Sequence, residues 1–72
     1  MTNTEALDIL RAQGYSAGTP DVHTGRVRIW IRGGDEAVDV QIGRELCDLA
    51  QGKVNLEEIR AVREDEAVAW TD

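Results

Sequence analysis

The stretch Arg26–Ile42 reads RVRIWIRGGDEAVDVQI, and its pattern decides the fold class of the chain. Residues Arg26–Arg32 alternate polar and apolar, with Trp30 on the polar side, which is typical of a half-buried strand. Glu36–Ile42 alternates in the same way, and Gly33-Gly34 between the two segments suits a two-residue hairpin turn. The stretch therefore predicts an antiparallel β-hairpin.

A turn at Gly33-Gly34 fixes the register of this hairpin. It places Arg32 opposite Asp35 and Arg28 opposite Asp39, so opposite charges meet twice on one face. The other face is apolar and consists of Val27, Ile29, Ile31, Val38, Val40 and Ile42. Because turn chemistry, alternation and charge select the same register, we expect the apolar face to contribute to the core.

Helical patterns lie on both sides of the hairpin. A first helix is predicted over about residues 4–13, capped by Asn3 or Thr4 and ended by Gly14. After Gly43, residues 44–51 form a second, short helix. Its apolar face is formed by Leu46, Leu49 and Ala50, with Cys47 beside it.

A third helix begins at Leu56 and runs to about Asp65. Asn55 and Glu58 form a capping box at its start. We expect an apolar stripe of Leu56, Ile59 and Val62 on this helix and an ion pair between Arg60 and Glu64, four residues apart.

Two segments leave alternatives open. Residues 14–25 read as a loop, in which a short strand around 16–22 is the alternative. Residues 66–70 either continue the third helix or form a strand. The expected fold class is α+β, with the order α-β-β-α-α and the helices packed on the hairpin. A hairpin alone is marginal, so a short third strand or a homodimer that extends the sheet would strengthen it.

Length and composition bound the possibilities. The chain has 72 residues, 42% of them hydrophobic, so we expect one globular domain over residues 1–72. One cysteine and one histidine leave no internal disulfide and too few ligands for a structural zinc site. The sequence has no membrane-span pattern, and its N-terminus does not resemble a signal peptide. The lone cysteine favours the cytoplasm, and the low lysine content suits a bacterial or phage genome.

Charge is distributed unevenly along the chain. The formal net charge is −6, but residues 1–34 carry four arginines against three acids, whereas residues 35–72 carry eleven acids against four bases. This distribution argues against general binding of duplex DNA, which requires a broad basic surface. It leaves room for a local basic patch.

That patch is the polar strand face, which we define as Arg26, Arg28, Trp30 and Arg32. Alternation along the strand places these four side chains next to one another on one side of the sheet. Tryptophan and arginine dominate interface hot spots, and they also stack on bases and bind phosphates. The competing interpretation is that Asp35 and Asp39 neutralise two of the arginines and that a helix, or the tail with Trp70, covers Trp30.

The third helix offers a second, acidic candidate surface. We predict that it contributes Glu57, Glu58 and Glu64 to partner binding. A run of acids on a helix is more often a solvated face than a mimic of a nucleic-acid backbone, so this surface is the weaker candidate.

Catalytic and cofactor sites find little support in the sequence. Asp21 and His23 could orient a general base, but no nucleophile stands near them in the sequence, and a solvated loop is the better interpretation. Cys47 has acidic neighbours, which disfavour a reactive thiolate, so we expect it to be structural. The glycines form no phosphate-binding motif. We therefore expect no enzyme activity, no cofactor and no metal.

Three functions follow by elimination. The first is a non-enzymatic protein-interaction module, such as a small bacterial or phage inhibitor or accessory protein. The second is a binder of single-stranded nucleic acid that uses the polar strand face. The third is a small enzyme subunit without catalytic residues. No motif in the chain assigns it to a family.

Overall fold

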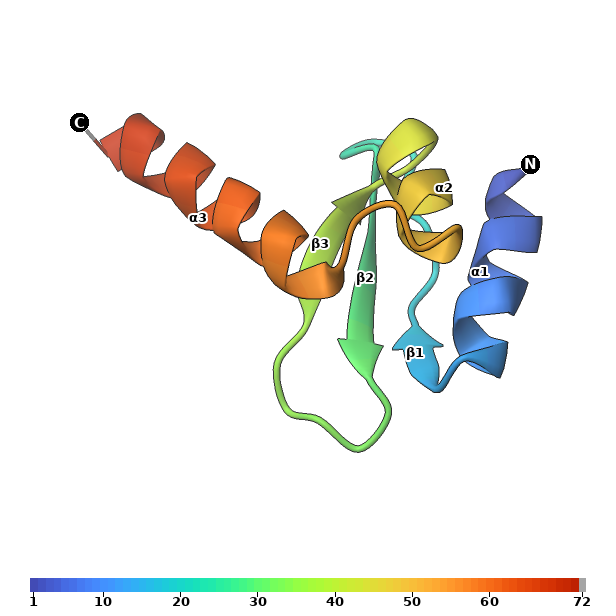
Figure 1. The fold of residues 1–72 in the computed structure, drawn as a ribbon. Coiled ribbons are helices and arrows are strands. Elements are labelled where there is room, and N and C mark those ends of the chain that lie inside the picture. The colour runs from blue at the N-terminus through green and yellow to red at the C-terminus, as the bar shows by residue number, and fades with distance from the viewer. Residues whose placement is uncertain (72) are drawn as a thin grey trace.

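The α+β class is confirmed, with one more strand than the basic order α-β-β-α-α. The computed structural model describes the backbone of residues 1–71 and the side chains of residues 1–67. Helix α1 (Asn3–Ala12) leads into an antiparallel sheet of β1 (Tyr15–Ala17), β2 (Arg26–Ile31) and β3 (Val38–Gln41), in the order β1-β2-β3. Helices α2 (Arg44–Ala50) and α3 (Leu56–Thr71) follow (Figure 1).

The short third strand lies in the segment that the sequence left open. Strand β1 pairs with β2, with Tyr15 opposite Ile31 and Ala17 opposite Ile29. The chain thus supplies its own third strand, and the sheet needs no second copy to reach three.

The predicted hairpin register is confirmed for its central pairs. Ile29 faces Val38, Arg28 faces Asp39 and Val27 faces Val40. The predicted two-residue turn is wrong, because the ladder ends at Ile29 and Val38. Instead, the N–H of Gly34 donates to the carbonyl of Ile31 at 2.8 Å, and Gly33 has a φ of 84°. A positive φ at the third turn position fits a type II turn, which bends the chain away from the partner strand.

The early end of the ladder changes the environment of Ile31. This side chain is 60% exposed, so its expected place in the core is wrong. The core on this face is formed by Val27, Ile29, Val38 and Val40, with Ile42 half-buried beside them. Helices α1 and α2 supply the opposite side of the core through Ala6, Leu7, Leu10, Leu46, Leu49 and Ala50.

The first helix begins earlier than expected. Thr2, and not Asn3 or Thr4, is its N-cap, and Thr2 and Glu5 form a capping box. The Asn3 side chain instead accepts a hydrogen bond from the N–H of Gly43 at 3.1 Å, which ties the start of α1 to the start of α2. A capped helix at the N-terminus is therefore confirmed, but the predicted capping residues are wrong by one or two positions.

Helix α3 is longer than predicted and carries a different inner stripe. It begins at Leu56 as expected, where the Glu58 N–H donates to the Asn55 side chain at 2.8 Å. Residues 66–70 continue it as helix. Leu56 and Ile59 are buried, but Val62 is 47% exposed, which corrects the predicted apolar stripe.

Beyond Ile59, charged groups face the rest of the protein. The Arg63 side chain is 14% exposed and pairs with Glu45 of α2 at 3.1 Å and with Glu66 at 3.4 Å. Arg60 pairs with Glu36 and Glu57; the predicted pair with Glu64 is not formed. Figure 1 shows the C-terminal half of α3 extending beyond the sheet.

Candidate functional site

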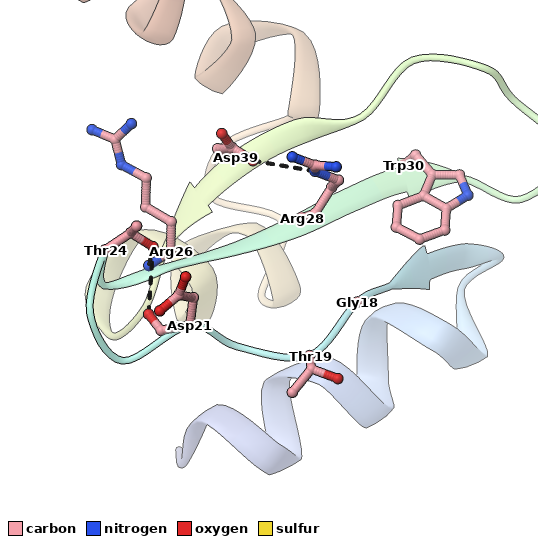
Figure 2. A pocket seen from close by; sticks show the side chains of 8 residues that line it. All are labelled: Gly18, Thr19, Asp21, Thr24, Arg26, Arg28, Trp30 and Asp39. Carbon is pink, nitrogen blue, oxygen red and sulfur yellow. Dashed lines mark hydrogen bonds and ion pairs between the residues drawn. The ribbon is translucent and has the colours of Figure 1, made fainter.

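The face of the sheet opposite the core is the candidate site. Along β2, Val27 and Ile29 are buried, whereas Arg28 is exposed and Trp30 half-buried. Asp39 of β3 lies across from Arg28, and an ion pair of 3.7 Å joins the Arg28 Nε to the Asp39 carboxylate. Figure 2 shows Arg28, Trp30 and Asp39 on the same side of the two strands. Period-2 alternation is the physical reason why a strand with one buried face presents these side chains on the other.

A cleft of about 500 Å³ lies on this face, and we call it the sheet cleft. Strand β2 contributes Arg26, Arg28 and Trp30 to the sheet cleft, and β3 contributes Asp39. The loop between β1 and β2 contributes Gly18, Thr19, Asp21 and Thr24 (Figure 2).

The loop wall of the cleft is held by local hydrogen bonds. Asp21 forms an isolated bridge with Arg26, and its carbonyl accepts from the N–H of Gly25 at 2.9 Å. Its carboxylate accepts from the backbone N–H of His23 at 2.8 Å, which is an Asx-type turn. The hydrogen bonds of this wall lie outside the sequence-based expectations, although a proline followed by an aspartate, as in Pro20-Asp21, is typical of turns.

The arginines of the polar strand face differ in how they are neutralised. Arg26 donates to Glu66 of α3 at 3.3 Å, with both side chains about two-fifths exposed (41% and 42%). Arg28 is 69% exposed, and its one ion pair among the described side chains is the 3.7 Å contact with Asp39. Arg32 has no ion pair with the described side chains, and the expected Arg32–Asp35 pair is absent because the ladder ends before it. The positive charge therefore becomes less compensated from Arg26 towards Arg32.

Arg32 is not among the residues that line the sheet cleft. Its backbone N–H donates to the carbonyl of Gly14 at 3.0 Å, so the pairing with β1 continues for one residue past the end of β2. The four residues of the polar strand face thus stay together on one surface, with Trp30 between Arg28 and Arg32.

Among the described side chains, the ion pair between α3 and the polar strand face is that of Glu66 with Arg26. The two helices α1 and α2 pack on the core face of the sheet, and α3 contacts β3. The side chain of Trp70, which the sequence offers as an internal cover, lies outside the described residues.

The acidic residues of α3 are distributed over several surfaces. Glu57 pairs with Arg60 at 3.6 Å, and Glu58 lines a hollow between α2 and α3. Glu64 lines a separate hollow between α3 and β3. Glu57 and Glu64 are seven residues apart, so they share a helix face. Glu58 is one residue after Glu57 and is therefore rotated about 100° from it around the helix axis.

Asp21, His23 and Cys47 are the groups that the sequence offers as candidates for catalysis. The Asp21 carboxylate is engaged by backbone, so it does not orient the exposed His23 ring. Cys47 is half-buried against the core, and its thiol lies 3.5 Å from the Met1 carbonyl. Within the part of the chain whose side chains are described, no three histidine, cysteine or acidic residues gather as metal ligands. Nor is any described helix long and apolar enough to cross a membrane.

Comparisons with known proteins add no assignment. No family model, curated protein or solved structure matches the chain.

Proposed function

We propose that this protein is a non-enzymatic interaction module that binds a protein partner through the polar strand face, with Trp30 at the centre. One observation carries the proposal: Trp30 and Arg28 line a cleft of about 500 Å³ on the sheet face opposite the core, which α3 meets at Arg26 through Glu66. Trp30 does not fill the core, since Val27 and Ile29 do so from the other side of the strand. A large aromatic ring in that position supports binding, because exposed aromatic area is stabilised when a partner covers it.

A protein fits this face better than a nucleic acid does. The chain has a formal net charge of −6, and carboxylates already compensate Arg26 and Arg28. Single-stranded nucleic-acid sites combine aromatic platforms with a positively charged groove that follows the phosphates. Asp21 and Asp39 in the sheet cleft oppose such a groove.

The acidic helix surface is the second part of the proposal. Glu57, Glu58 and Glu64 are exposed, and they would contact basic groups of the same partner or of another one. The role that suits a chain of 72 residues with these surfaces is that of a small inhibitor or accessory protein, of bacterial or phage origin. The single unpaired cysteine supports a cytoplasmic location.

The test compares two substitutions on the same strand. Trp30→Ala removes the ring from the polar strand face, whereas Ile31→Ala removes apolar area from an exposed position on the other side. Each tagged variant is used to capture partners from lysate of the source organism, with and without nuclease treatment, and the captured protein is then purified and titrated. Thermal melting of each variant is measured in parallel.

We expect Trp30→Ala to weaken binding by about 2 kcal/mol or more and to leave the melting temperature unchanged, as for a central hot spot. Ile31→Ala should bind like the parent. A Trp30→Ala variant that melts at a lower temperature yet binds normally would show that the ring is covered internally, and the proposal would fail. Loss of capture on nuclease treatment would assign the face to nucleic acid.

A further inference from the structure

We infer that the partner offers the polar strand face an extended acidic segment, with two carboxylates four residues apart and an aromatic or other apolar side chain midway between them. The inference rests on the proposed function and specifies the chemistry of its ligand. It follows from the unused donors on this face, from their spacing and from the carboxylates that the chain itself places there.

Several hydrogen-bond donors on this face have no acceptor among the described residues. Among the described residues, the terminal nitrogens of Arg28 form no hydrogen bond, since its contact with Asp39 runs through Nε. The guanidinium hydrogen bonds among the described residues come from Arg26, Arg60 and Arg63, so the Arg32 guanidinium has none there, and neither has the Trp30 indole N–H. These groups only donate, so the ligand that completes them must bring acceptors.

The spacing of the side chains on this face matches that of an extended segment. Arg28, Trp30 and Arg32 are alternate residues whose backbone remains in register with β1, through Trp30 opposite Ser16 and through the Arg32–Gly14 hydrogen bond. At about 3.3 Å per residue, the Cα atoms of Arg28 and Arg32 are roughly 13 Å apart. An extended segment has the same repeat, so its first and fifth side chains reach the two arginines while the third meets Trp30. On a helix, side chains four residues apart are only about 6 Å apart, which is half the required span.

The molecule already pairs this face with carboxylates. Glu66 accepts from Arg26 and Asp39 lies against Arg28, so arginine–carboxylate recognition is the chemistry that the face uses within the chain. Arginine binds a carboxylate through two parallel N–H donors, and the terminal nitrogens of Arg28 and Arg32 are available for this geometry. A phosphate dianion carries about twice the charge of a carboxylate, so Asp39 beside Arg28 opposes it more strongly than it opposes a carboxylate ligand.

The experiment is a titration of the ¹⁵N-labelled protein with short synthetic peptides. The probe is acetyl-Glu-Thr-Tyr-Thr-Glu-amide. The first control replaces both glutamates by glutamine, and the second, acetyl-Thr-Glu-Tyr-Glu-Thr-amide, brings the two carboxylates closer together. The readout is the indole N–H resonance of Trp30, identified by its loss in the Trp30→Phe variant. Arg32→Gln is compared with Arg44→Gln, because the Arg44 side chain is 96% exposed on α2, away from this face.

We expect the probe to shift the Trp30 indole resonance and to bind at least tenfold more tightly than either control peptide. Arg32→Gln should lower the affinity severalfold, and Arg44→Gln should leave it unchanged. Equal binding of the glutamate and glutamine peptides, or equal effects of the two arginine substitutions, overturns the inference.

The two proposals fail separately. A captured partner that depends on Trp30, together with no preference for the acidic peptide, leaves the proposed function standing and removes the acidic ligand. If the acidic peptide binds at Trp30 but no captured partner depends on Trp30, the acidic ligand stands and the proposed function fails. Tighter binding of a single-stranded oligothymidylate than of the probe overturns the inference in favour of a nucleic acid.

Discussion

Ile29 and Ile31 are the same residue type on the same face of the predicted strand, yet only one belongs to the core. Ile29 is fully buried, whereas Ile31 is 60% exposed. Alternation in the sequence cannot separate them, because period 2 assigns both to one side. The difference arises where the β2–β3 ladder ends, which depends on the turn after Ile31 and on contacts with α3.

This difference gives a matched pair of substitutions. We expect Ile29→Asp to unfold the domain at room temperature, because the free energy of burying an unpaired charge exceeds the free energy of unfolding of so small a domain. Ile31→Asp should stay folded, with a change in unfolding free energy within about 1 kcal/mol. Circular dichroism and amide dispersion in NMR spectra measure both. A folded Ile29→Asp variant would contradict the core described above.

At the scale of the elements, the hairpin shows what the sequence could predict and what it could not. The register was predictable because apolar alternation and the Arg28–Asp39 pair select it independently. The turn was not, because Gly33-Gly34 suits a two-residue turn as well as the turn that begins at Ile31. An ion pair between Glu36 and Arg60, which are 24 residues apart in the sequence, also holds the loop towards α3. The local sequence pattern cannot predict such a pair.

The candidate site was predictable to a similar extent. Arg26, Arg28 and Trp30 line the sheet cleft as strand alternation indicates. The loop that forms the remaining wall depends on how Asp21 bridges back to Arg26, which is a tertiary contact. The partner of Arg26 was equally hidden, because Glu66 is 40 residues away along the chain.

Helix α3 is attached to the domain by two different kinds of contact, and this yields a prediction for Arg63. Its apolar contacts come from Leu56 and Ile59 at its start, and Arg63 then bridges Glu45 and Glu66. Arg63→Ala would leave the Glu45 carboxylate, 21% exposed, without its cation. We expect a loss of about 1–3 kcal/mol in unfolding free energy, typical of a charged group deprived of its partner.

Arg44 on α2 supplies the control for that substitution. Its side chain is 96% exposed and lies 4.0 Å from Asp48, a geometry that contributes little to stability. Arg44→Ala should therefore change the unfolding free energy by less than about 0.5 kcal/mol. Urea titrations followed by circular dichroism compare the two variants, and equal effects would show that α3 does not depend on the Arg63 bridge.

At the scale of the whole molecule, the local charge of the polar strand face and the total charge have opposite signs. The chain carries −6 and extends over 38 × 25 × 22 Å, while Arg28 and Arg32 have little compensation on their own surface. An acidic ligand is thus repelled from afar and attracted at contact. The two effects act over different distances, so salt separates them.

The resulting prediction concerns the association rate of the acidic peptide. At about 10 mM salt the Debye length is roughly 30 Å, so the ligand experiences the charge of the whole molecule; at about 100 mM it is roughly 10 Å, and mainly the nearby arginines act. We expect the association rate constant to rise between these concentrations, since screening removes long-range repulsion first, and to fall at higher salt as the contact attraction weakens. Stopped-flow fluorescence with a labelled peptide measures it. A steep fall from the lowest salt onward is the behaviour of a surface dominated by phosphate-type contacts, and it would argue for a nucleic-acid ligand instead.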